Sequence, residues 1–203
     1  MVAHSRYNVS ESNAGLFEGV LKNKTGITSQ KDLGILETLL LKDAYIHFQQ
    51  LLEQGKVQFN LSFLYEVHKY FLFTLYSWAG KTRTVDISKN GVLFAPVAYM
   101  DISLKHLENT LHAQIPNPTD TKKQISEKLA IIHNECNMVH PFRDGNGRTT
   151  IRLFLDLLAS TLDYEFINWS IEQKNMYLTA CKAGIAKNHT PMQTFIYKAL
   201  SKK

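Results

Sequence analysis

The chain has 203 residues, of which 44% are hydrophobic and 20% charged, so its length suits one domain with a single buried core. Its 11 Phe and 9 Tyr, set against only 10 Gly and 5 Pro, exclude a disordered, collagen-like or low-complexity chain. The formal net charge of +5 comes from scattered residues without a clustered basic stripe, which argues against a nucleic-acid-binding protein.

The chain begins with a polar segment that is followed by a strongly periodic helix. Residues 1–30 show little apolar patterning, so we expect residues 1–34 to form a loosely docked N-terminal segment before one domain at 35–203. Between residues 32 and 54, apolar positions recur at intervals of three and four, which predicts a helix that ends at Gly55. The apolar positions are Leu33, Leu36, Leu40, Ala44, Phe48 and Leu51.

A second helix and a β-hairpin follow. Asn60 is a suitable N-cap for a helix over residues 61–78, whose dense aromatic and aliphatic residues indicate burial on most sides. Residues 82–96 contain two β-prone runs around Asn90-Gly91, a strong hairpin signal, and we expect a surface flap that is the one clear β element. We expect the basic residues around it to be solvated, although they could attract phosphate or an acidic target; they are Lys81, Arg83 and Lys89.

The next two helices are predicted over residues 99–115 and from Thr121 onward. Thr121 and Gln124 fit a capping box at the start of the second of them. Its apolar positions form one stripe, so we interpret Cys136 as a small core residue and not as a reactive thiol. The stripe contains Ile125, Leu129, Ile132, Cys136 and Val139.

The C-terminal third is also helical in its patterning. Residues 148–160 are apolar almost all round, which predicts a central buried helix. Ser170 and Gln173 form another capping box, and Pro191 stands near the start of a last helix that runs to the end of the chain. The sequence therefore predicts an all-α fold of about seven helices with one hairpin.

The segment HPFRDGNGRT, from His140 to Thr149, lies between two strongly apolar predicted helices. Pro141 disfavours helix at His140 and helps to end the preceding helix there. Gly145, Asn146 and Gly147 can adopt positive φ and turn backbone N–H groups inward, directly before a helix N-terminus. Such a nest, together with the unsatisfied N–H groups of the helix, is suited to binding phosphate.

The side chains of this loop have the properties that phosphoryl-group chemistry needs. Arg148 adds a permanent cation with bidentate donors, and Asp144, which would repel phosphates by itself, is best interpreted as a Mg²⁺ ligand. His140 has its reference pKa near neutrality, which suits a base that deprotonates a hydroxyl attacking phosphorus. Phe142 is the apolar member, and we expect it to anchor the loop in the core. These parts cover positioning and charge stabilisation.

The loop resembles the signature of the Fic family, H-P-F-x-(D/E)-G-N-G-R-x-x-R. Two further segments, WAGKTRTVDISKNGVLFAP and NWSIEQKNMYLTACKAG, resemble the flap and the nucleotide-pocket lining of that family, and the likeness extends over residues 35–200. The resemblance implies an all-α Fic core with a β-hairpin flap at residues 35–203. It also implies transfer of AMP from ATP and Mg²⁺ to a hydroxyl side chain of a target protein, with release of pyrophosphate.

The resemblance assigns roles to individual residues. His140 would be the general base and Asp144 the Mg²⁺ ligand, while the flap would border the nucleotide and clamp the main chain of the target by strand addition. Tyr177 would border the adenine, although its neighbours also fit a plain core stripe. The residues expected to bind the nucleotide are Lys89, Asn90, Gly91, Val92, Arg143, Gly145, Asn146, Gly147, Arg148, Thr149 and Tyr177.

One position departs from the family signature. Where the family has a second Arg that positions the γ-phosphate, this chain has Ile151, and Arg152 stands one residue later. On an α-helix this shift is a rotation of about 100°, so Arg152 either reaches the phosphate from a new direction or pairs with Asp156 one turn away. The inhibitory pattern (S/T)-x-x-x-E-(G/N) of the family has no complete match in the sequence.

Three hypotheses remain open at this point. The first is a toxin-type adenylyltransferase controlled by a small separate antitoxin, and the second is a Fic fold with another phosphoryl or nucleotidyl transfer, as in relatives that resemble Doc. The third is a weakly active module that binds a partner through its flap. In each, the partners are proteins and not nucleic acid or membrane. Two Cys without a CxxC and no long apolar run favour the cytoplasm, with secretion into a host cell left open.

Overall fold

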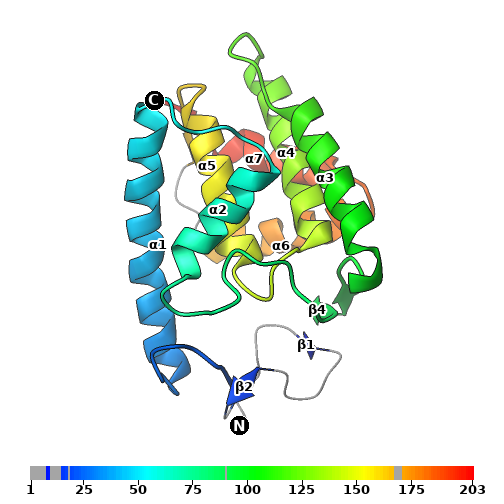
Figure 1. Ribbon diagram of the computed structural model, residues 1–203. Helices are drawn as coiled ribbons and strands as arrows, with labels where there is room; N and C mark the ends of the chain where they lie inside the picture. The colour runs from blue at the N-terminus through cyan, green and yellow to red at the C-terminus, as the bar shows by residue number, and fades with distance from the viewer. Residues whose placement is uncertain (1–7, 10–14, 18, 90, 167–170) are drawn as a thin grey trace.

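The computed structural model describes residues 8–9, 15–17, 19–89, 91–166 and 171–203. For residues 8, 9, 17, 148–150, 171 and 172 it describes the backbone alone. This part of the chain forms seven α-helices, a short 3₁₀ helix, a π-helix and three small antiparallel sheets (Figure 1). The predicted all-α fold is confirmed. None of the described helices is both long enough and apolar enough to cross a membrane.

The helices and strands have the following bounds. The helices are α1 Gln30–Glu53, α2 Leu61–Leu72, η1 Val97–Tyr99, α3 Met100–Gln114, α4 Lys122–Val139, η2 Asn146–Ile151, α5 Arg152–Ser160, α6 Ile171–Ile185 and α7 Thr190–Ala199. The strands are β1 Asn8–Val9, β2 Leu16–Phe17, β3 Val20–Leu21, β4 Ile87–Lys89, β5 Val92–Leu93, β6 Tyr164–Phe166 and β7 Leu200–Lys202.

The predicted capping residues begin two of these helices. The Asn60 side chain accepts a hydrogen bond from the backbone N–H of Phe63 at 2.9 Å. Thr121 and Gln124 form both bonds of the capping box at the start of α4, as expected. These caps satisfy N–H groups that have no partner within the helix. The third predicted cap, Ser170, lies outside the described residues.

Helices α4 and α5 form the centre of the molecule. Helix α4 packs against α3 on one side and against α6 and α7 on the other, while α1 and α2 pack together and α1 also contacts α5 (Figure 1). The apolar pattern of α5 predicted a central buried helix, and this prediction is confirmed. Its buried residues are Leu153, Phe154, Leu155, Leu157, Leu158 and Ala159. Both ends of the loop that begins at His140 are therefore attached to core helices.

Helix α2 is shorter than the sequence predicted, since it ends at Leu72 and not at residue 78. Residues 73–80 instead form turns that bring Gly80 back onto α2. Gly80 has φ 70°, and a Cβ atom there would lie 2.5 Å from the Cβ atom of Lys69. The apolar pattern continues past Leu72 because Leu75 and Tyr76 are buried in the core without being helical.

Both ends of the chain differ from the sequence expectations. The last helix stops at Ala199, and β7 then pairs with β6, so the prediction of helix to the end of the chain was wrong. In the N-terminal segment, β2 pairs with β3, and Val20 and Leu21 are buried in the main core. This part of the segment is therefore docked more firmly than expected. The hairpin is also not the one β element of the chain.

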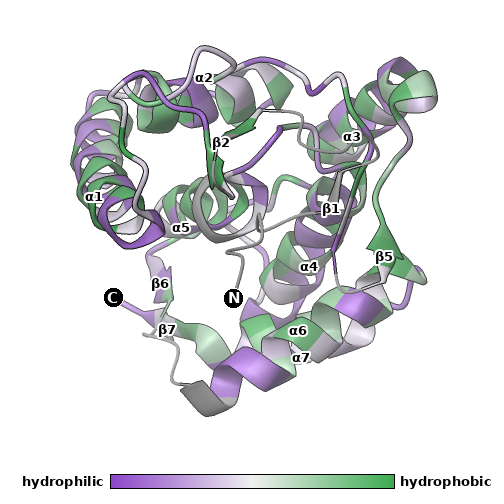
Figure 2. Ribbon diagram, turned by 90° about the horizontal axis from the view of Figure 1, so that it is seen from below, coloured by the Kyte–Doolittle hydropathy of each residue, from purple (hydrophilic) through white to green (hydrophobic). Residues whose placement is uncertain are grey.

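The predicted flap is present as the antiparallel pair β4 and β5. Ser88 faces Leu93 and Lys89 faces Val92 across the hairpin. Asn90 lies outside the described residues, whereas Gly91 has the positive φ of 78° that a tight hairpin turn favours. Strand β1 pairs with the other side of β4, which gives the sheet order β1-β4-β5. Figure 2 views the molecule from the end at which this sheet lies.

Candidate active site

The loop expected to carry the chemistry begins where α4 ends, at His140. The backbone N–H of His140 donates to Cys136 O at 3.0 Å, and the residue itself is the C-cap in the left-handed region, with φ 47° and ψ 61°. Pro141 prevents the helix from continuing, as predicted. A residue with a Cβ atom is strained in this region by roughly 1–2 kcal/mol. Contacts from outside the helix must therefore hold His140 in place.

The hydrogen bond of the imidazole determines its tautomer. Nδ1 of His140 lies 2.9 Å from the carbonyl oxygen of Asn137. A carbonyl only accepts, so Nδ1 carries the proton and Nε2 carries the lone pair. The ring stacks on Phe94 with 3.7 Å between ring centres and an interplanar angle of 13°. The structure thus holds the ring with Nε2 in the form that can accept a proton.

The charge state of His140 is set mainly by burial. Only 3% of the residue is exposed, and this burial lowers its pKa to about 3. The bond to Asn137 raises the pKa, while the positive charges of Lys89 and Arg83, and the neighbouring His133, lower it further. Without a bound anion, the imidazole is neutral at pH 7.

Asp144 and Gly145 form the middle of the loop. Asp144 is 4% exposed, and its Oδ1 accepts from the N–H of Gly145 at 2.6 Å. Gly145 has φ 79°, and a Cβ atom there would lie 2.8 Å from Cδ1 of Leu72 and 3.4 Å from Nε2 of His68. Both the backbone conformation and the lack of space therefore require glycine at position 145.

The donor set around Asp144 suits Mg²⁺ only in combination with a ligand. The described residues contain no group of three or more His, Cys, Asp or Glu side chains that could hold a metal by themselves. Mg²⁺ is commonly bound by one or two carboxylates together with phosphate oxygens and water. One buried carboxylate beside a phosphate-binding loop fits this mode of binding.

His68 on α2 is a contributor to the site that the sequence did not reveal. Nδ1 of His68 accepts from the N–H of Gly80 at 2.8 Å, so Nε2 carries the proton and donates to the carbonyl of Asp144 at 2.9 Å. The His68 ring stacks on Phe142 with 3.7 Å between ring centres. The bond to the loop depends on a partner 76 positions away, which local sequence patterns do not reveal.

Phe142 and Asn146 hold the loop in shape, Phe142 by its burial and Asn146 by hydrogen bonds across the loop. Phe142 is 1% exposed, which confirms the predicted anchor. The side chain of Asn146 accepts from the N–H of Phe142 at 2.9 Å and donates to its carbonyl at 2.7 Å. Of the three residues expected to take positive φ, only Gly145 does so, since Asn146 and Gly147 belong to the π-helix. Positive φ is thus accessible to all three residues by their types, but the structure uses it at Gly145 alone.

The segment after the loop is a π-helix where the sequence predicted an α-helix. Arg148 and Thr149 contribute backbone to η2, and their side chains lie outside the described part of the structure. In a π-helix the hydrogen bond runs from i to i+5, so a turn contains one residue more than an α-helical turn. The residue by which this chain exceeds the spacing of the Fic signature is thus absorbed within η2. The rotation of about 100°, which assumed an α-helix, does not apply.

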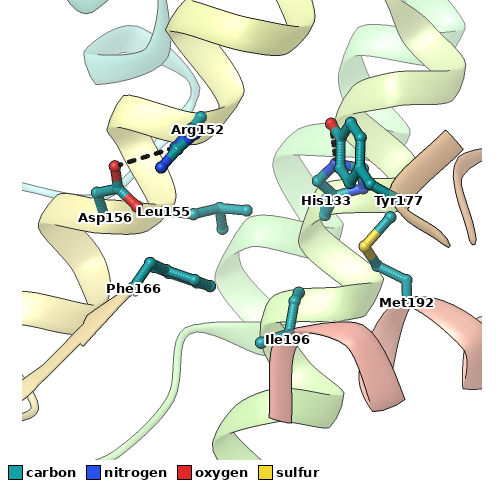
Figure 3. A pocket seen from close by; sticks show the side chains of 8 residues that line it. All are labelled: His133, Arg152, Leu155, Asp156, Phe166, Tyr177, Met192 and Ile196. Atoms are coloured by element: carbon teal, nitrogen blue, oxygen red, sulfur yellow. Dashed lines mark hydrogen bonds and ion pairs between the residues drawn. The ribbon is translucent and has the colours of Figure 1, made fainter. Parts of the chain in front are cut away.

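Arg152 follows the π-helix as the first residue of α5. Its Nε lies 3.7 Å from Oδ2 of Asp156, so the intrahelical pair given above as one alternative is confirmed. Tyr45 also donates to this carboxylate. Arg152 lines a small cavity together with Tyr177, whose hydroxyl lies 2.9 Å from Nε2 of His133 (Figure 3). Tyr177 is partly buried and lies at the wall of this cavity.

The flap lies beside the loop that begins at His140. Val92 and Lys89 are partly buried, and the charge of Lys89 lowers the pKa of both His140 and Cys181 on α6. Arg143 is also buried, at 8% exposure. Apart from Tyr177, the other described residues that we expect to bind the nucleotide lie in the flap, the loop or η2.

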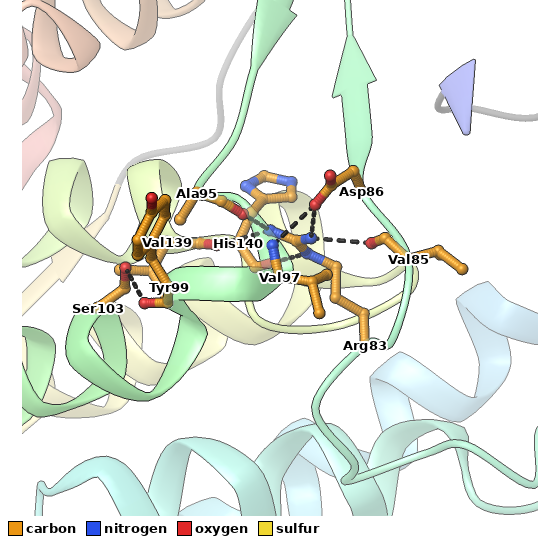
Figure 4. Close-up of polar contacts among 9 residues, drawn as sticks. All are labelled: Arg83, Val85, Asp86, Ala95, Val97, Tyr99, Ser103, Val139 and His140. Atoms are coloured by element: carbon orange, nitrogen blue, oxygen red, sulfur yellow. Dashed lines mark hydrogen bonds and ion pairs between the residues drawn. The ribbon is translucent and has the colours of Figure 1, made fainter. Parts of the chain in front are cut away.

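Arg83 is the clearest error of the sequence prediction. We expected a solvated surface residue, whereas Arg83 is 4% exposed. Its guanidinium donates to the carbonyl of His140 at 2.8 Å and to carbonyls at both ends of the flap (Figure 4). The other basic residues of that group are exposed or partly buried, namely Lys81 and Lys89 respectively.

Residues 58–159 match the family model described as Fic/DOC family. The chain is 32% identical over 163 residues to the protein adenylyltransferase VbhT of Bartonella schoenbuchensis; the match covers 78% of this chain, which spans about a third of that protein, or 32%. It is 29% identical over 182 residues to the probable protein adenylyltransferase y4lH of Sinorhizobium fredii, covering 89% of this chain and 91% of the relative.

Solved structures show the same fold. The BepC protein of Bartonella tribocorum, a VirB-translocated effector whose crystal structure contains AMPPNP, superposes with a TM-score of 0.74. The match covers 93% of this chain and 97% of that one at 23% sequence identity. The overall fold is therefore shared although few residues are identical.

Proposed function

The chain belongs to the Fic/DOC family, and on this premise we propose that it is a protein adenylyltransferase that moves AMP from ATP to a hydroxyl side chain of a target protein. The observation that carries the proposal is the buried imidazole of His140, held with its lone pair on Nε2 at the start of a loop that contains Asp144. We place the transferase domain at residues 35–203.

The proposed reaction is an in-line displacement at the α-phosphorus. The target hydroxyl oxygen forms a bond to the α-phosphorus, the bond from this phosphorus to the β-bridging oxygen breaks, and pyrophosphate leaves. Nε2 of His140 takes the hydroxyl proton. Mg²⁺ held by Asp144 and the phosphates would neutralise part of the developing charge. The nucleotide is bound by the set given above, with Arg143, Gly145, Asn146, Gly147, Arg148 and Thr149 at the phosphates and Tyr177 near the base.

The low pKa of His140 has a consequence for this role. A base with a pKa of about 3 takes a proton reluctantly, and the best pKa for a base lies near the working pH. A bound triphosphate brings negative charge to the loop, and negative charge favours the imidazolium form. ATP is therefore expected to raise the pKa of His140, so that the base becomes competent when the substrate is present.

The transferred group distinguishes the proposal from its main alternative. We expect purified protein with Mg²⁺ and a cell lysate to incorporate label from ATP labelled at the α-phosphorus and not from ATP labelled at the γ-phosphorus. Mass spectrometry of the labelled protein should show one added AMP. An added phosphate, with label from the γ-position alone, would instead establish phosphorylation and contradict the proposal.

Replacing the base is expected to remove most of this activity. His140→Ala should lower the rate of AMP incorporation by about 10²–10⁴-fold, because general base catalysis contributes a factor of this size. The rate is measured at saturating ATP with the α-labelled nucleotide. His112→Ala is the matched control, since His112 is exposed on α3, and it should leave the rate unchanged. Equal rates for wild type and His140→Ala would exclude His140 as the base.

The proposed partners are the protein that receives AMP and a small antitoxin that acts in trans. The second proposal is supported by the lack of a complete (S/T)-x-x-x-E-(G/N) pattern in the sequence.

A further inference from the structure

We propose that Arg83 is a positioning residue for the transfer reaction, which holds the His140 backbone and the base of the flap in one fixed arrangement. The inference rests on the proposed function, because it concerns the geometry of the proposed base. The sequence assigned Arg83 no catalytic, nucleotide-binding or metal-binding role, and we expected its side chain to be solvated. Its position is defined by five hydrogen bonds to backbone carbonyls.

Three consecutive carbonyls around His140 accept hydrogen bonds from Arg83. Nε donates to His140 O at 2.8 Å, and NH2 donates to Val139 O at 3.3 Å. The backbone N–H of Arg83 donates to Pro141 O at 2.8 Å. The last carbonyls of a helix have no partner within the helix, and a cation is favourable at this end of the helix dipole. Arg83 therefore satisfies the end of α4 at the residue whose left-handed backbone needs external support.

The remaining donors of Arg83 reach the flap. NH1 donates to Val85 O at 2.8 Å, two residues before β4 begins, and NH2 donates to Ala95 O, two residues after β5 ends (Figure 4). Asp86 lies 3.7 Å from NH1 and accepts from the N–H of Val97 at 2.7 Å. The guanidinium thus joins both ends of the hairpin to the end of α4.

The arginine side chain is specifically suited to this arrangement. Its side chain is fully buried, whereas its ionic partner Asp86 is 43% exposed, so the charge is compensated mainly by carbonyl dipoles. A planar guanidinium presents five donors in a rigid fork, while a lysine ammonium presents three donors around one point. Lysine at this position could keep the charge but could not reach carbonyls of the helix and of both flap ends together. The number and spacing of the carbonyls that accept from this side chain therefore require the planar guanidinium of arginine.

The phosphate end of the loop is held by other residues. His68 supports the carbonyl of Asp144, and Asn146 bonds to both backbone groups of Phe142. Arg83 contacts neither of these. Loss of Arg83 should accordingly displace the base relative to the target hydroxyl and lower the transfer rate. The flap also borders the nucleotide, but its two strands stay paired with each other, so nucleotide binding should weaken much less than the rate falls. A displacement of about 1 Å in an active site can cost about 10²-fold in rate.

The test compares Arg83→Lys and Arg83→Met with Phe48→Leu. Phe48, on α1, is fully buried against Phe63 of α2, and its substitution serves as the control for a general loss of stability. For each variant, urea unfolding gives the stability, calorimetry gives the Kd for ATP with Mg²⁺, and α-labelled ATP gives the transfer rate at saturation. We expect both Arg83 variants to lose about 10²-fold in rate while the Kd changes by less than about 3-fold.

A second readout does not depend on turnover. Nitrogen NMR of the His140 ring in the wild-type protein should show the proton on Nδ1, which is bonded to Asn137 O. In Arg83→Lys the backbone of His140 loses its support, so the ring should leave this bond and exchange between the two tautomers. The inference is overturned if Arg83→Lys keeps the wild-type transfer rate and a fixed tautomer. It is also overturned if Phe48→Leu, at the same free energy of unfolding as the Arg83 variants, loses as much of the transfer rate as they do. If the wild type transfers no AMP, the proposed function fails, and the tautomer signature alone decides the role of Arg83.

Discussion

Lowering the pH from neutral to about 4.5 is expected to reduce the free energy of unfolding by on the order of 5 kcal/mol. Three buried histidines cause this effect. Burial lowers the pKa of His68 and His133 to about 4 and that of His140 to about 3, from the usual 6.5. Below pH 6.5 the unfolded chain binds protons at these positions and the folded chain does not, so acid favours unfolding.

Asp156 acts in the opposite direction. Burial raises its pKa from 3.8 to about 6, so the folded chain binds one proton more than the unfolded chain between these values. The three histidines take up three protons on unfolding, and Asp156 releases one, so the net uptake is about two protons. Each proton taken up changes the free energy of unfolding by about 1.4 kcal/mol per pH unit. The stability is therefore fully present above pH 6.5 and falls as the pH drops toward 4.

Urea unfolding at several pH values, followed by tryptophan fluorescence, measures this dependence. His133→Gln serves as the internal check, because removing one buried histidine should reduce the slope of stability against pH by about one proton. Equal unfolding free energies at pH 7 and pH 4.5 would show that the histidines do not stay neutral in the folded protein.

The second large effect is expected at Ile151, where the family signature has arginine. Ile151 is 2% exposed and belongs to the main core, so Ile151→Arg should destabilise the protein by on the order of 4 kcal/mol and abolish folding or activity. A guanidinium buried at position 151 would lie in the hydrophobic core, without groups arranged to accept its hydrogen bonds. The substitution that restores the letters of the signature is therefore expected to damage the protein.

Deleting one threonine is the change that should restore the spacing. Thr149 and Thr150 are adjacent, so removal of either gives the same chain, with Arg152 three residues after Arg148. We expect the π-helical turn to become α-helical and the protein to remain folded and active, because Ile151 keeps its place before α5. Thermal unfolding and AMP incorporation measure both variants. An unfolded deletion variant beside a stable Ile151→Arg would contradict the role assigned to η2.

Local signals in the sequence predicted much of this structure. Apolar periodicity located the helices, and the side chains of Asn60 and Thr121 act as the predicted caps. Cys136 is a core residue as expected, 1% exposed, with a pKa that burial raises to about 12. Such features depend on neighbours within a few residues, which is why a single sequence reveals them.

The features that were missed depend on distant partners or on a change of helix type. The burial of Arg83 comes from carbonyls up to 57 positions away, and no local pattern distinguishes it from a surface arginine. The bonds of His68 to Asp144 and Gly80 are hidden for the same reason. The π-helix could not be found because apolar periodicity around Ile151 fits an α-helix equally well. The roles of the nucleotide-binding residues remain predictions.

The pairing of β1 with β4 determines how another polypeptide can approach the flap. An incoming strand needs a sheet edge whose backbone groups are not already paired. In the described part of the sheet, β4 lies between β1 and β5, so β5 is the one of the two hairpin strands that lies at an edge, and Leu93 on it is 61% exposed. A partner must add to β5 or displace residues 8–9 of the chain itself from β4. Residues 8–9 therefore leave β5 as the hairpin strand to which a partner can add without displacing part of the chain itself.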